Sequence, residues 1–321
     1  MTKLQRILIG LLIVQVILAG VVLWPRGVAA VAKEPLFPGL NADNVVRLTI
    51  AGNEGSSVEL ARQGDAWVLA NGGDYPAIGE SITAVIAKIA AAQTDRLVAQ
   101  TAVSQKQLQV ADDDFVRHVT LETSDGETFE FYMGSAPSTS TTHVRRAGEE
   151  ATYLVANLNV WEISQLASSW VDTAYVELDE ATVTAVTLQN ANGTFTFHKT
   201  GPDEWVMDDL AADETFNRGN FNLILNRGAS LRLTRPLGKE AQPAYGMDTP
   251  QASLTLTVES DNASGVYTLD VGTALENGNA VVKWSGSPYY AEVSPFTVEN
   301  LLNFGRSDFL EVPTPEAETG G

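Results

Sequence analysis

The sequence predicts an α+β protein with two tandem copies of one module, each a twisted antiparallel sheet with two helices, behind an N-terminal transmembrane helix. Three observations support this prediction. Apolar and polar residues alternate from Asn44 to Leu69, and a similar stretch returns 138 positions later, from Thr182 to Met207. Each stretch is followed by an apolar stripe at helical spacing. An uninterrupted apolar run precedes both copies.

The composition limits the kinds of function. With 321 residues, of which 44% are hydrophobic, the chain can form one large or two medium domains. It has no cysteine, which excludes disulfides, a thiol nucleophile and thiolate zinc sites. Its 40 acidic and 20 basic residues give a net charge of −20, which would repel nucleic acid. A solvated acidic surface is the simplest interpretation, and weak divalent-cation binding or docking to a basic partner is the alternative.

The apolar run over residues 7–24 predicts a transmembrane anchor. Its 18 residues span about 27 Å as a helix, close to the ~30 Å hydrocarbon core of a bilayer. Lys3 and Arg6 favour a cytoplasmic location for residues 1–6, so we expect a single pass through the cytoplasmic membrane and an extracytoplasmic body. A signal peptide cleaved near Ala30-Val31-Ala32 is the competing interpretation, although this apolar run is longer than the apolar region of an ordinary signal peptide. Residues 25–43, which include KEPLFPGL, should form an extended linker.

The first copy, residues 44–181, begins with three predicted strands. Residues 46–50, 58–60 and 67–69 have strand-like apolar patterns and are separated by the turn sequences GNEG and GD. Trp67 should point into the core, and a stacking platform for a sugar or aromatic ligand is its functional alternative. From Ile78 we expect a helix of about 12 to 15 residues. Its apolar stripe is Ile82, Val85, Ile86 and Ile89.

The rest of the first copy predicts two hairpins and a closing helix. Strands at 115–123 and 128–133 are joined by Ser-Asp-Gly, and strands at 144–146 and 152–155 by Ala-Gly. Val160 to Trp170 should form a short amphipathic helix. The acidic run at residues 112–114 lacks the EF-hand spacing, so we interpret Asp112, Asp113 and Asp114 as a solvated loop.

The second copy, residues 182–310, repeats these features in register. The offset of 138 aligns pairs across the whole unit, among them Leu48 with Val186, Trp67 with Trp205, Ile86 with Ile224, Gly134 with Gly272 and Val155 with Val293. The helical stripe returns as Phe221, Ile224, Leu225 and Gly228. Nearby asparagines give this helix a weaker propensity than its counterpart. The tail, residues 311–321, should be disordered.

We predict no catalytic, cofactor-binding or metal-binding residue. His118, His143 and His198 have no partner at a metal-binding helical spacing, and two fall in predicted strands and one in a loop. The sequons at Asn192 and Asn262 fall in predicted turns, which explain them without glycosylation. No nucleotide-binding or nucleophile motif occurs. A pair of carboxylates that meet only in three dimensions, as in glycoside hydrolases, stays open.

Two segments, AYGMDTP at Ala244 to Pro250 and GDAW at Gly64 to Trp67, resemble a known family. It is called domain of unknown function 4340, DUF4340. Its pattern has strands, one of which ends in tryptophan, a helix, a Tyr-Gly-Leu-x-x-Pro segment, a hairpin ending in glycine and a strand pair with a tyrosine, here near Tyr153 or Tyr290. The resemblance covers about residues 44–310, but in the first copy residues 108–114 replace the Tyr-Gly segment. It implies a single-span envelope protein found with ABC-2 type permeases and gliding-motility-like auxiliary subunits, without established catalytic residues.

We therefore expect a membrane-anchored, extracytoplasmic, non-catalytic accessory or scaffold subunit of an envelope ABC-type transport assembly. Its partners would be the membrane and a permease or auxiliary membrane subunits. The alternative is a ligand-binding module that holds a glycan or a divalent cation in the cleft between the copies. An exposed tryptophan among Trp161, Trp170 and Trp284, close to acids, would favour this alternative. A hydrolase with a carboxylate pair is the third hypothesis.

Overall fold

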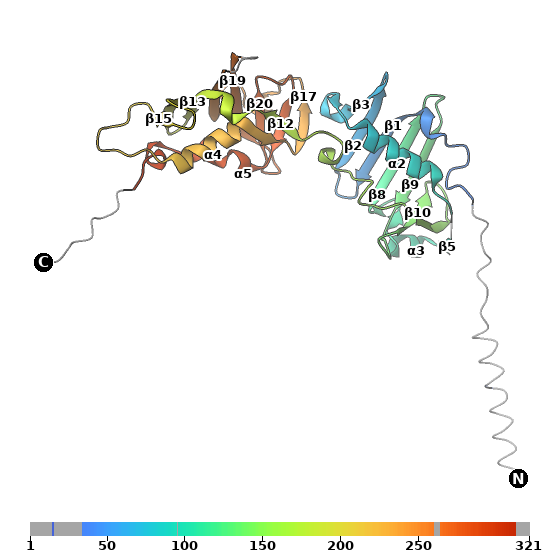
Figure 1. Cartoon of the computed structure of the whole chain (residues 1–321). Coiled ribbons are helices and arrows are strands. Elements are labelled where there is room, and N and C mark those ends of the chain that lie inside the picture. Colours follow the sequence, from blue (N-terminus) through green and yellow to red (C-terminus); the bar gives the residue numbers. More distant parts are fainter. Residues whose placement is uncertain (1–14, 16–33, 95, 260–263, 313–321) are drawn as a thin grey trace, which may run out of the picture.

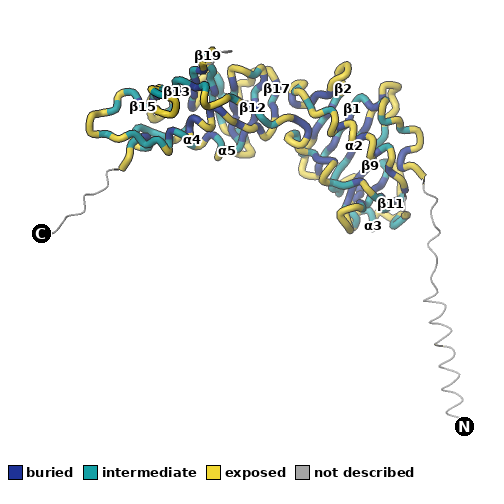
Figure 2. Tube along the Cα trace, viewed as in Figure 1, coloured by how far each residue is buried: buried dark blue, intermediate teal, exposed yellow. Residues whose placement is uncertain are grey.

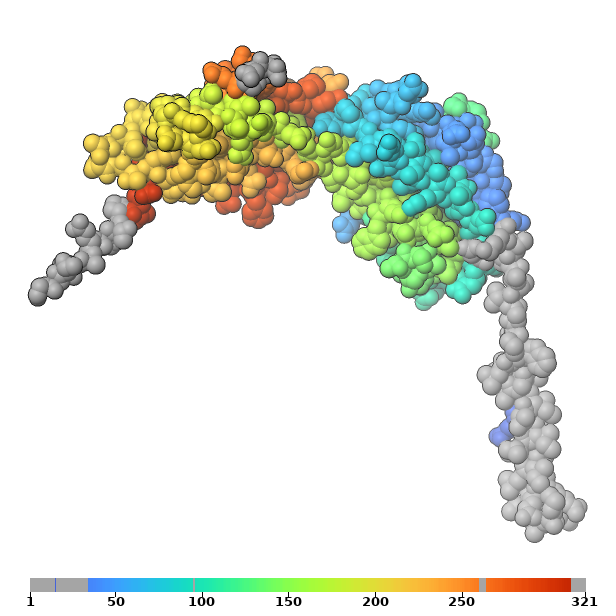
Figure 3. All heavy atoms as spheres, viewed as in Figure 1, coloured from blue at the N-terminus to red at the C-terminus, as the bar shows by residue number. Residues whose placement is uncertain are grey.

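The computed structural model describes residues 15, 34–94, 96–259 and 264–312. They form two bodies that meet at an angle and make an arch (Figures 1 and 3). Each body is built on a large antiparallel sheet, in agreement with the predicted mixture of strands and helices. Within the described residues no helix is long and apolar enough to cross a membrane. Apart from Gln15, the predicted anchor at 7–24 lies outside them, as does the tail beyond residue 312.

The first body contains a nine-stranded sheet of described residues in the order β4-β3-β2-β1-β8-β9-β10-β11-β5. The predicted strands and hairpins are confirmed, except that the strand predicted from Phe115 begins at Arg117 and Phe115 lies in a separate short strand. Trp67 is buried, and Figure 2 shows the buried residues following the strands. In β1, Val45 rather than Val46 is buried, because the register with β8 shifts between Val45 and Arg47. The strands are β1 (Val45–Gly52), β2 (Ser57–Gln63), β3 (Ala66–Leu69), β4 (Tyr75–Pro76), β5 (Arg96–Ala99), β8 (Arg117–Thr123), β9 (Thr128–Met133), β10 (Thr141–Arg146) and β11 (Thr152–Ala156), with β6 (Val110–Ala111) and β7 (Asp114–Phe115) as a separate pair.

Helix α2 (Gly79–Ala91) lies across the first sheet (Figure 1). All four residues of its predicted stripe are buried, which confirms the helical interpretation of this segment. A second helix, α3 (Ala102–Gln107), was not predicted at this position. It begins after Thr101, whose hydroxyl accepts a hydrogen bond from the amide of Ser104.

The helix predicted at residues 160–170 is wrong. This segment contains only the short 3-10 turn η3 (Ala167–Ser169). The carbonyl oxygens of Ile163 and Ser164 accept hydrogen bonds from the side chains of Arg117, at 3.0 Å, and Trp170, at 2.8 Å. Because these carbonyls are engaged by side chains, they are not available to the amides of a helical turn.

The extended linker predicted over residues 25–43 is wrong from Glu34 onward. Leu36 and Phe37 are buried in the core of the first body, where the Phe37 ring contacts Phe129 and Phe131. The Leu36 amide donates to the carbonyl of Ala92 at 2.7 Å, and a 3-10 turn, η1 (Ala42–Asn44), leads into β1. The two apolar residues are worth roughly 2 kcal/mol each when buried, which favours packing over an extended linker.

The second body contains an eight-stranded sheet of described residues in the order β15-β14-β13-β18-β19-β20-β21-β17. Helices α4 (Arg218–Ala229) and α5 (Pro295–Asn303) pack against each other and against this sheet. The predicted stripe of α4 is buried. The strands are β13 (Val183–Asn190), β14 (Gly193–Lys199), β15 (Trp205–Met207), β17 (Arg235–Gly238), β18 (Ala252–Glu259), β19 (Ser264–Ala274), β20 (Ala280–Trp284) and β21 (Tyr290–Val293). The 3-10 turn η4 (Glu180–Thr182) precedes β13, η5 (Pro243–Tyr245) lies between β17 and β18, and η6 (Arg306–Phe309) follows α5.

The two sheets follow one strand order. The series β3-β2-β1-β8-β9-β10-β11-β5 corresponds, position by position, to the whole of the second sheet. Strand β13 also has a register shift between Val183 and Ala185, at the position of the shift in β1. Whether the bodies are copies of one module stays a prediction.

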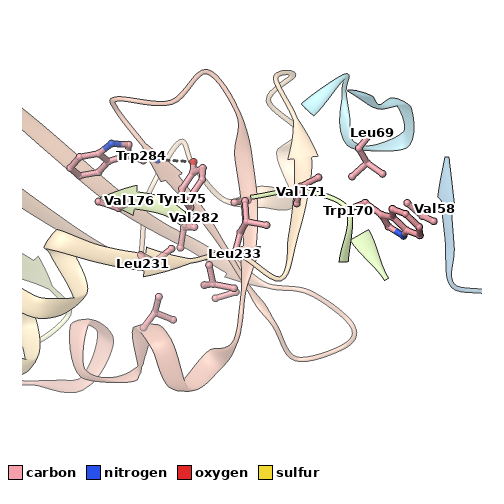
Figure 4. Packing of buried hydrophobic residues seen from close by; sticks show 14 of the residues in the cluster. Val58, Leu69, Trp170, Val171, Tyr175, Val176, Leu231, Leu233, Val282 and Trp284 are labelled. Carbon is pink, nitrogen blue, oxygen red and sulfur yellow. Dashed lines mark hydrogen bonds between the residues drawn. The ribbon is translucent and has the colours of Figure 1, made fainter. Parts of the chain in front are cut away.

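The chain passes between the bodies at residues 170–174, where Figure 4 shows buried apolar side chains on both sides. The Ile78 amide donates to the carbonyl of Trp170 at 2.7 Å, and Val171 pairs with Ala77. The next strand, β12 (Ala174–Glu177), pairs with β16 (Ser230–Arg232) of the second body. The second body therefore begins before the predicted boundary near Ala181.

Four further contacts lie at the junction, of which the two made by Tyr175 are within the second body and the other two cross between the bodies. The Tyr175 hydroxyl donates to the carbonyl of Tyr289 at 2.5 Å and accepts from the amide of Trp284 at 3.0 Å, and burial raises the pKa of Tyr175 to about 12. The Tyr289 hydroxyl donates across the junction to the carbonyl of Asp74 at 2.9 Å. The backbone of Gly73, at φ 70°, lies so close to Gly238 that a Cβ on Gly73 would collide with the Gly238 Cα.

We predict that Gly73→Ala destabilises the protein more than Gly64→Ala. Both glycines have positive φ, 70° and 62°, so alanine at either position should cost about 1 to 2 kcal/mol of backbone strain. Gly64 faces open space, whereas Gly73 meets Gly238, which should add roughly 1 to 3 kcal/mol. Urea unfolding of the full-length chain, followed by circular dichroism, measures the difference. Equal midpoints for the two variants would contradict a closely packed junction.

Candidate functional site in the cleft between the bodies

A cleft of about 540 Å³ lies where the two bodies meet. This volume falls within the usual range for small-molecule sites, about 300 to 1,000 Å³. The first body contributes the β1–β2 turn, η2 (Ala70–Gly72) and the segment 165–168, and the second body contributes β17, β21 and the β19–β20 turn. The lining residues are Gly55, Ser56, Ser57, Asn71, Gln165, Leu166, Ala167, Ser168, Thr234, Arg235, Asn277, Asn279 and Glu292.

Glu292 is the buried centre of a hydrogen-bond network on one wall of this cleft. Its side chain is 4% exposed and lies opposite Arg235 in the β21–β17 register. Its Oε2 accepts from Nε and Nη2 of Arg235, at 3.1 and 3.0 Å. Its Oε1 accepts from the side-chain amides of Asn277 and Asn279, at 2.7 and 2.6 Å. The four donors compensate the carboxylate for its burial.

The charge of Glu292 follows from this arrangement. Burial by itself raises the pKa of the carboxyl, but the hydrogen bonds from Asn279 and Asn277 and the charge of Arg235 outweigh burial and hold the pKa below its ordinary value. Glu292 is therefore ionised at neutral pH. A carboxylate held in this state secures the β19–β20 turn to β21 and is poorly suited to act as a general acid.

The rest of the lining offers hydroxyl and amide groups. Ser56, Ser57 and Ser168 contribute hydroxyls from the first body. The Gln165 Oε1 is shielded from solvent and has no hydrogen-bond partner among the described residues. A shielded carbonyl oxygen without a donor is costly, by about 1 to 3 kcal/mol, so Gln165 is a position where a ligand or water donor would be stabilising.

The lining suits a small, uncharged, hydroxyl-rich ligand better than a cation or a hydrolytic reaction. The charges of Arg235 and Glu292 cancel, and a cation would have to displace the donors that Glu292 already holds. Within the described residues no three ligating side chains converge on a metal position. Among the described residues that line the cleft, Glu292 is the sole acid, whereas glycoside hydrolysis needs two carboxylates.

The histidines and the acidic run examined in the sequence lie away from this cleft. Their partners are separate: His118 Nε2 meets Glu130 at 2.6 Å, His143 Nδ1 meets the Ser135 carbonyl at 2.8 Å, and His198 Nδ1 meets Asp208 at 2.7 Å. His143 lies in β10, not in the predicted loop. Asp112 forms an ion pair with Arg145, and Asp113 forms one with Lys106, so the two carboxylates have different basic side chains as partners.

The three tryptophans considered for ligand binding separate into two buried residues and one exposed residue. Trp170 is 2% exposed and Trp284 6%, whereas Trp161 is 82% exposed. Trp161 lines a smaller hollow beside α2 and not the cleft. The Asn192 side chain donates to the carbonyl of Asn303 at 2.8 Å, which gives it a structural role in its turn, and Asn262 lies outside the described residues.

Sequence reasoning missed all four members of the Glu292 network. The available signal was an acid inside an apolar stretch, since Glu292 stands between Ala291 and Val293 in β21. Its partners come from two separate segments, residue 235 and residues 277–279; the Asn-Gly pair in the second segment indicates a turn, but neither segment has a ligand-binding or catalytic motif.

We predict that Glu292→Gln destabilises the protein by about 2 to 4 kcal/mol at neutral pH, because the new amide group would face hydrogen-bond donors. The folded pKa of Glu292 lies below its ordinary 4.5, so its contribution to stability is complete above pH 4.5 and is lost as pH falls through the folded value. The difference between wild type and variant in urea unfolding should shrink in that acid range. Glu299→Gln, at an exposed position on α5, is the control and should change stability by less than ~0.5 kcal/mol. If the difference in unfolding free energy between wild type and Glu292→Gln stays constant as the pH falls below 4.5, the lowered pKa of Glu292 is contradicted.

Comparison with known proteins assigns a family but no activity. No curated protein and no solved structure matches the chain. The family described as "Domain of unknown function (DUF4340)" matches residues 67–250, more than half of the chain, from β3 of the first body into the second. In the AYGMDTP segment, η5 is followed by Gly246 at φ 66°, so these residues form a turn. By this match the chain belongs to the DUF4340 family.

Proposed function

We propose that the protein is a membrane-anchored, extracytoplasmic, non-catalytic accessory or scaffold subunit of an envelope ABC-type transport assembly. The observation that supports this role is the buried junction, in which residues 170–176 join both cores and Tyr289 bonds across to Asp74. A scaffold has to hold its binding surfaces at a fixed separation, and a large apolar junction restricts relative motion of domains. The transport assembly itself is inferred from the family resemblance and from the predicted anchor at 7–24.

The position of the first described residues suits an anchored body. The N-terminal end of the first body, drawn in blue, lies on the side that faces away from the second body (Figure 1). An anchor that precedes this point would place the first body nearer to its attachment and the second farther along the arch. Partners would then meet two surfaces at different distances from the anchor.

We also propose that the two bodies are tandem copies of one module. The common strand order and the matching register shifts in β1 and β13 support this origin. A second observation comes from Gly134 and Gly272, which the offset of 138 aligns. A Cβ at Gly134 would collide with the carbonyl of Leu108, and one at Gly272 with the carbonyl of Tyr245, so the same backbone crossing occurs in both.

A second candidate function is binding of a small glycan in the cleft between the bodies. The observation that favours it is the shielded Gln165 Oε1 without a partner among the described residues, in a cleft whose other groups include several hydroxyls. Saccharide hydroxyls supply donors that could reach such lining groups.

For the accessory role, we predict that the full-length chain, extracted in mild detergent from cells that produce it, carries a permease or auxiliary membrane subunit with it. Affinity purification followed by mass spectrometry identifies these partners. Gly73→Ala should reduce their recovery because it disturbs the junction, whereas Gly64→Ala should retain it. Recovery of the protein alone under these conditions contradicts the proposal.

For the cleft, we predict that Gln165→Ala weakens binding of neutral disaccharides to the full-length chain about threefold to tenfold, the loss of one hydrogen bond. Isothermal titration calorimetry measures the affinity. Gln189→Ala, at an exposed position on β13, is the matched control. Absence of binding, or binding that both variants leave unchanged, would rule out the cleft as a glycan site.

A further inference from the structure

Trp161 is the most exposed of the three tryptophans considered for ligand binding, Trp161, Trp170 and Trp284. Its exposed fraction is 82%. An indole ring left in water keeps a large apolar face available for contact with a ligand or partner. The backbone around it is held in place: the amides of Glu162 and Ile163 both donate to the carbonyl of Asn159, at 3.2 and 3.3 Å, and Ile163 is buried. The ring is thus presented from a fixed turn.

The residue after Trp161 is tied to helix α2. Glu162 Oε1 accepts from Lys88 Nζ at 2.6 Å, with side chains 38% and 47% exposed. A pair this exposed contributes little to stability, about 0 to 1 kcal/mol. It does, however, place a carboxylate and an ammonium in the same hollow as the indole. Each can form further hydrogen bonds, Glu162 through its second carboxylate oxygen and Lys88 through its remaining N–H groups.

These groups surround a hollow of about 300 Å³, which is at the lower end of the range for ligand sites. Its apolar part includes Val85 and Trp170, both buried. Its polar part includes Lys88, Glu162 and the hydroxyls of Ser81 and Ser169. The small side chain of Ala84 completes the α2 side. The hollow therefore combines one open aromatic ring with a polar rim.

We propose that this hollow binds a sugar ring of a neutral carbohydrate. A sugar ring has an apolar face of C–H groups and an edge of hydroxyls, so the face would lie on the Trp161 indole. The hydroxyl edge would bond to Glu162, Lys88 and Ser81. This site is separate from the cleft and does not depend on the accessory role. The Glu162–Lys88 pair carries no net charge, which favours a neutral ligand, and the net charge of −20 of the whole protein disfavours an anionic saccharide.

A protein partner is the competing occupant, because exposed tryptophans are frequent hot spots of protein interfaces. Interface hot spots lie in patches whose centre is poor in charged residues. The surroundings of Trp161 differ, since an ion pair and two hydroxyls line the same hollow. This composition favours the carbohydrate.

The test is calorimetric titration of the full-length chain, in detergent, with neutral tetrasaccharides of glucose, N-acetylglucosamine, galactose or mannose and with the four monosaccharides. We expect saturable binding of at least one tetrasaccharide. Trp161→Ala should weaken it by about tenfold or more, and Trp161→Phe, which keeps an aromatic face, by about threefold or less. Glu162→Gln should weaken binding about threefold to tenfold by removing an acceptor. Binding of the monosaccharide alone to the same site would identify a free sugar as the ligand, and binding only of the tetrasaccharide would identify a polymer.

Phe296→Ala is the matched control, because Phe296 is 78% exposed but lies on α5 of the second body. All these variants should keep the wild-type circular dichroism spectrum and unfolding midpoint, since the altered side chains lie on the surface. The proposal is overturned if no saccharide binds up to about 10 mM, or if Trp161→Ala binds as wild type does. It is also overturned if Trp161→Ala loses a co-purifying protein while saccharide binding is absent, which would identify a protein docking site.

Discussion

The close approach of Gly73 and Gly238 determines how the two sheets are joined. Because neither residue has a side chain, the turn after β3 can lie directly on the end of β17, and Tyr75 and Tyr289 can meet edge-on with ring centroids 4.7 Å apart. The same approach brings the segment 165–168 opposite Arg235 and Glu292 and so creates the cleft. The cleft is therefore a consequence of the junction, and any change in the angle between the bodies would alter its lining.

Local patterns were sufficient to predict most of the architecture. Alternation in β1 and β2, the Ser-Asp-Gly turn and the stripe of α2 each depend on residues within one segment, where period and turn chemistry decide the outcome. The errors involve partners that are distant in the sequence. Residues 160–170 have the apolar pattern of a helix, but the side chain of Arg117, in β8, donates to the Ile163 carbonyl that the helix would need. The sequence around Leu36 is typical of a linker, and its burial depends on a sheet formed by residues distant in the sequence.

The site was harder to predict than the fold for a similar reason. Four donors converge on Glu292 from β17 and from the β19–β20 turn, and no spacing rule connects those segments. The exposure of Trp161 was equally inaccessible, because Trp161 and Trp170 stand nine positions apart in one apolar pattern yet one is exposed and the other buried. Composition gives the total charge of the chain but cannot place any individual charge.

Corresponding positions in the two bodies show where their chemistry has diverged. At the offset of 138, Arg145 aligns with Lys283 and Leu154 with Glu292. Arg145 is buried, donates to the Val110 carbonyl and to Asp112, and lies over the Tyr132 ring, whereas the Lys283 ammonium donates to the carbonyl of Trp284. Each charge is satisfied within its own body by a different set of partners. Among the described residues that line the cleft, the ion pair Arg235–Glu292 comes from the second body and the hydroxyls come mainly from the first, so a ligand there would need both bodies at once. A rigid junction is the physical condition for such a shared site, and it is equally the condition for a scaffold.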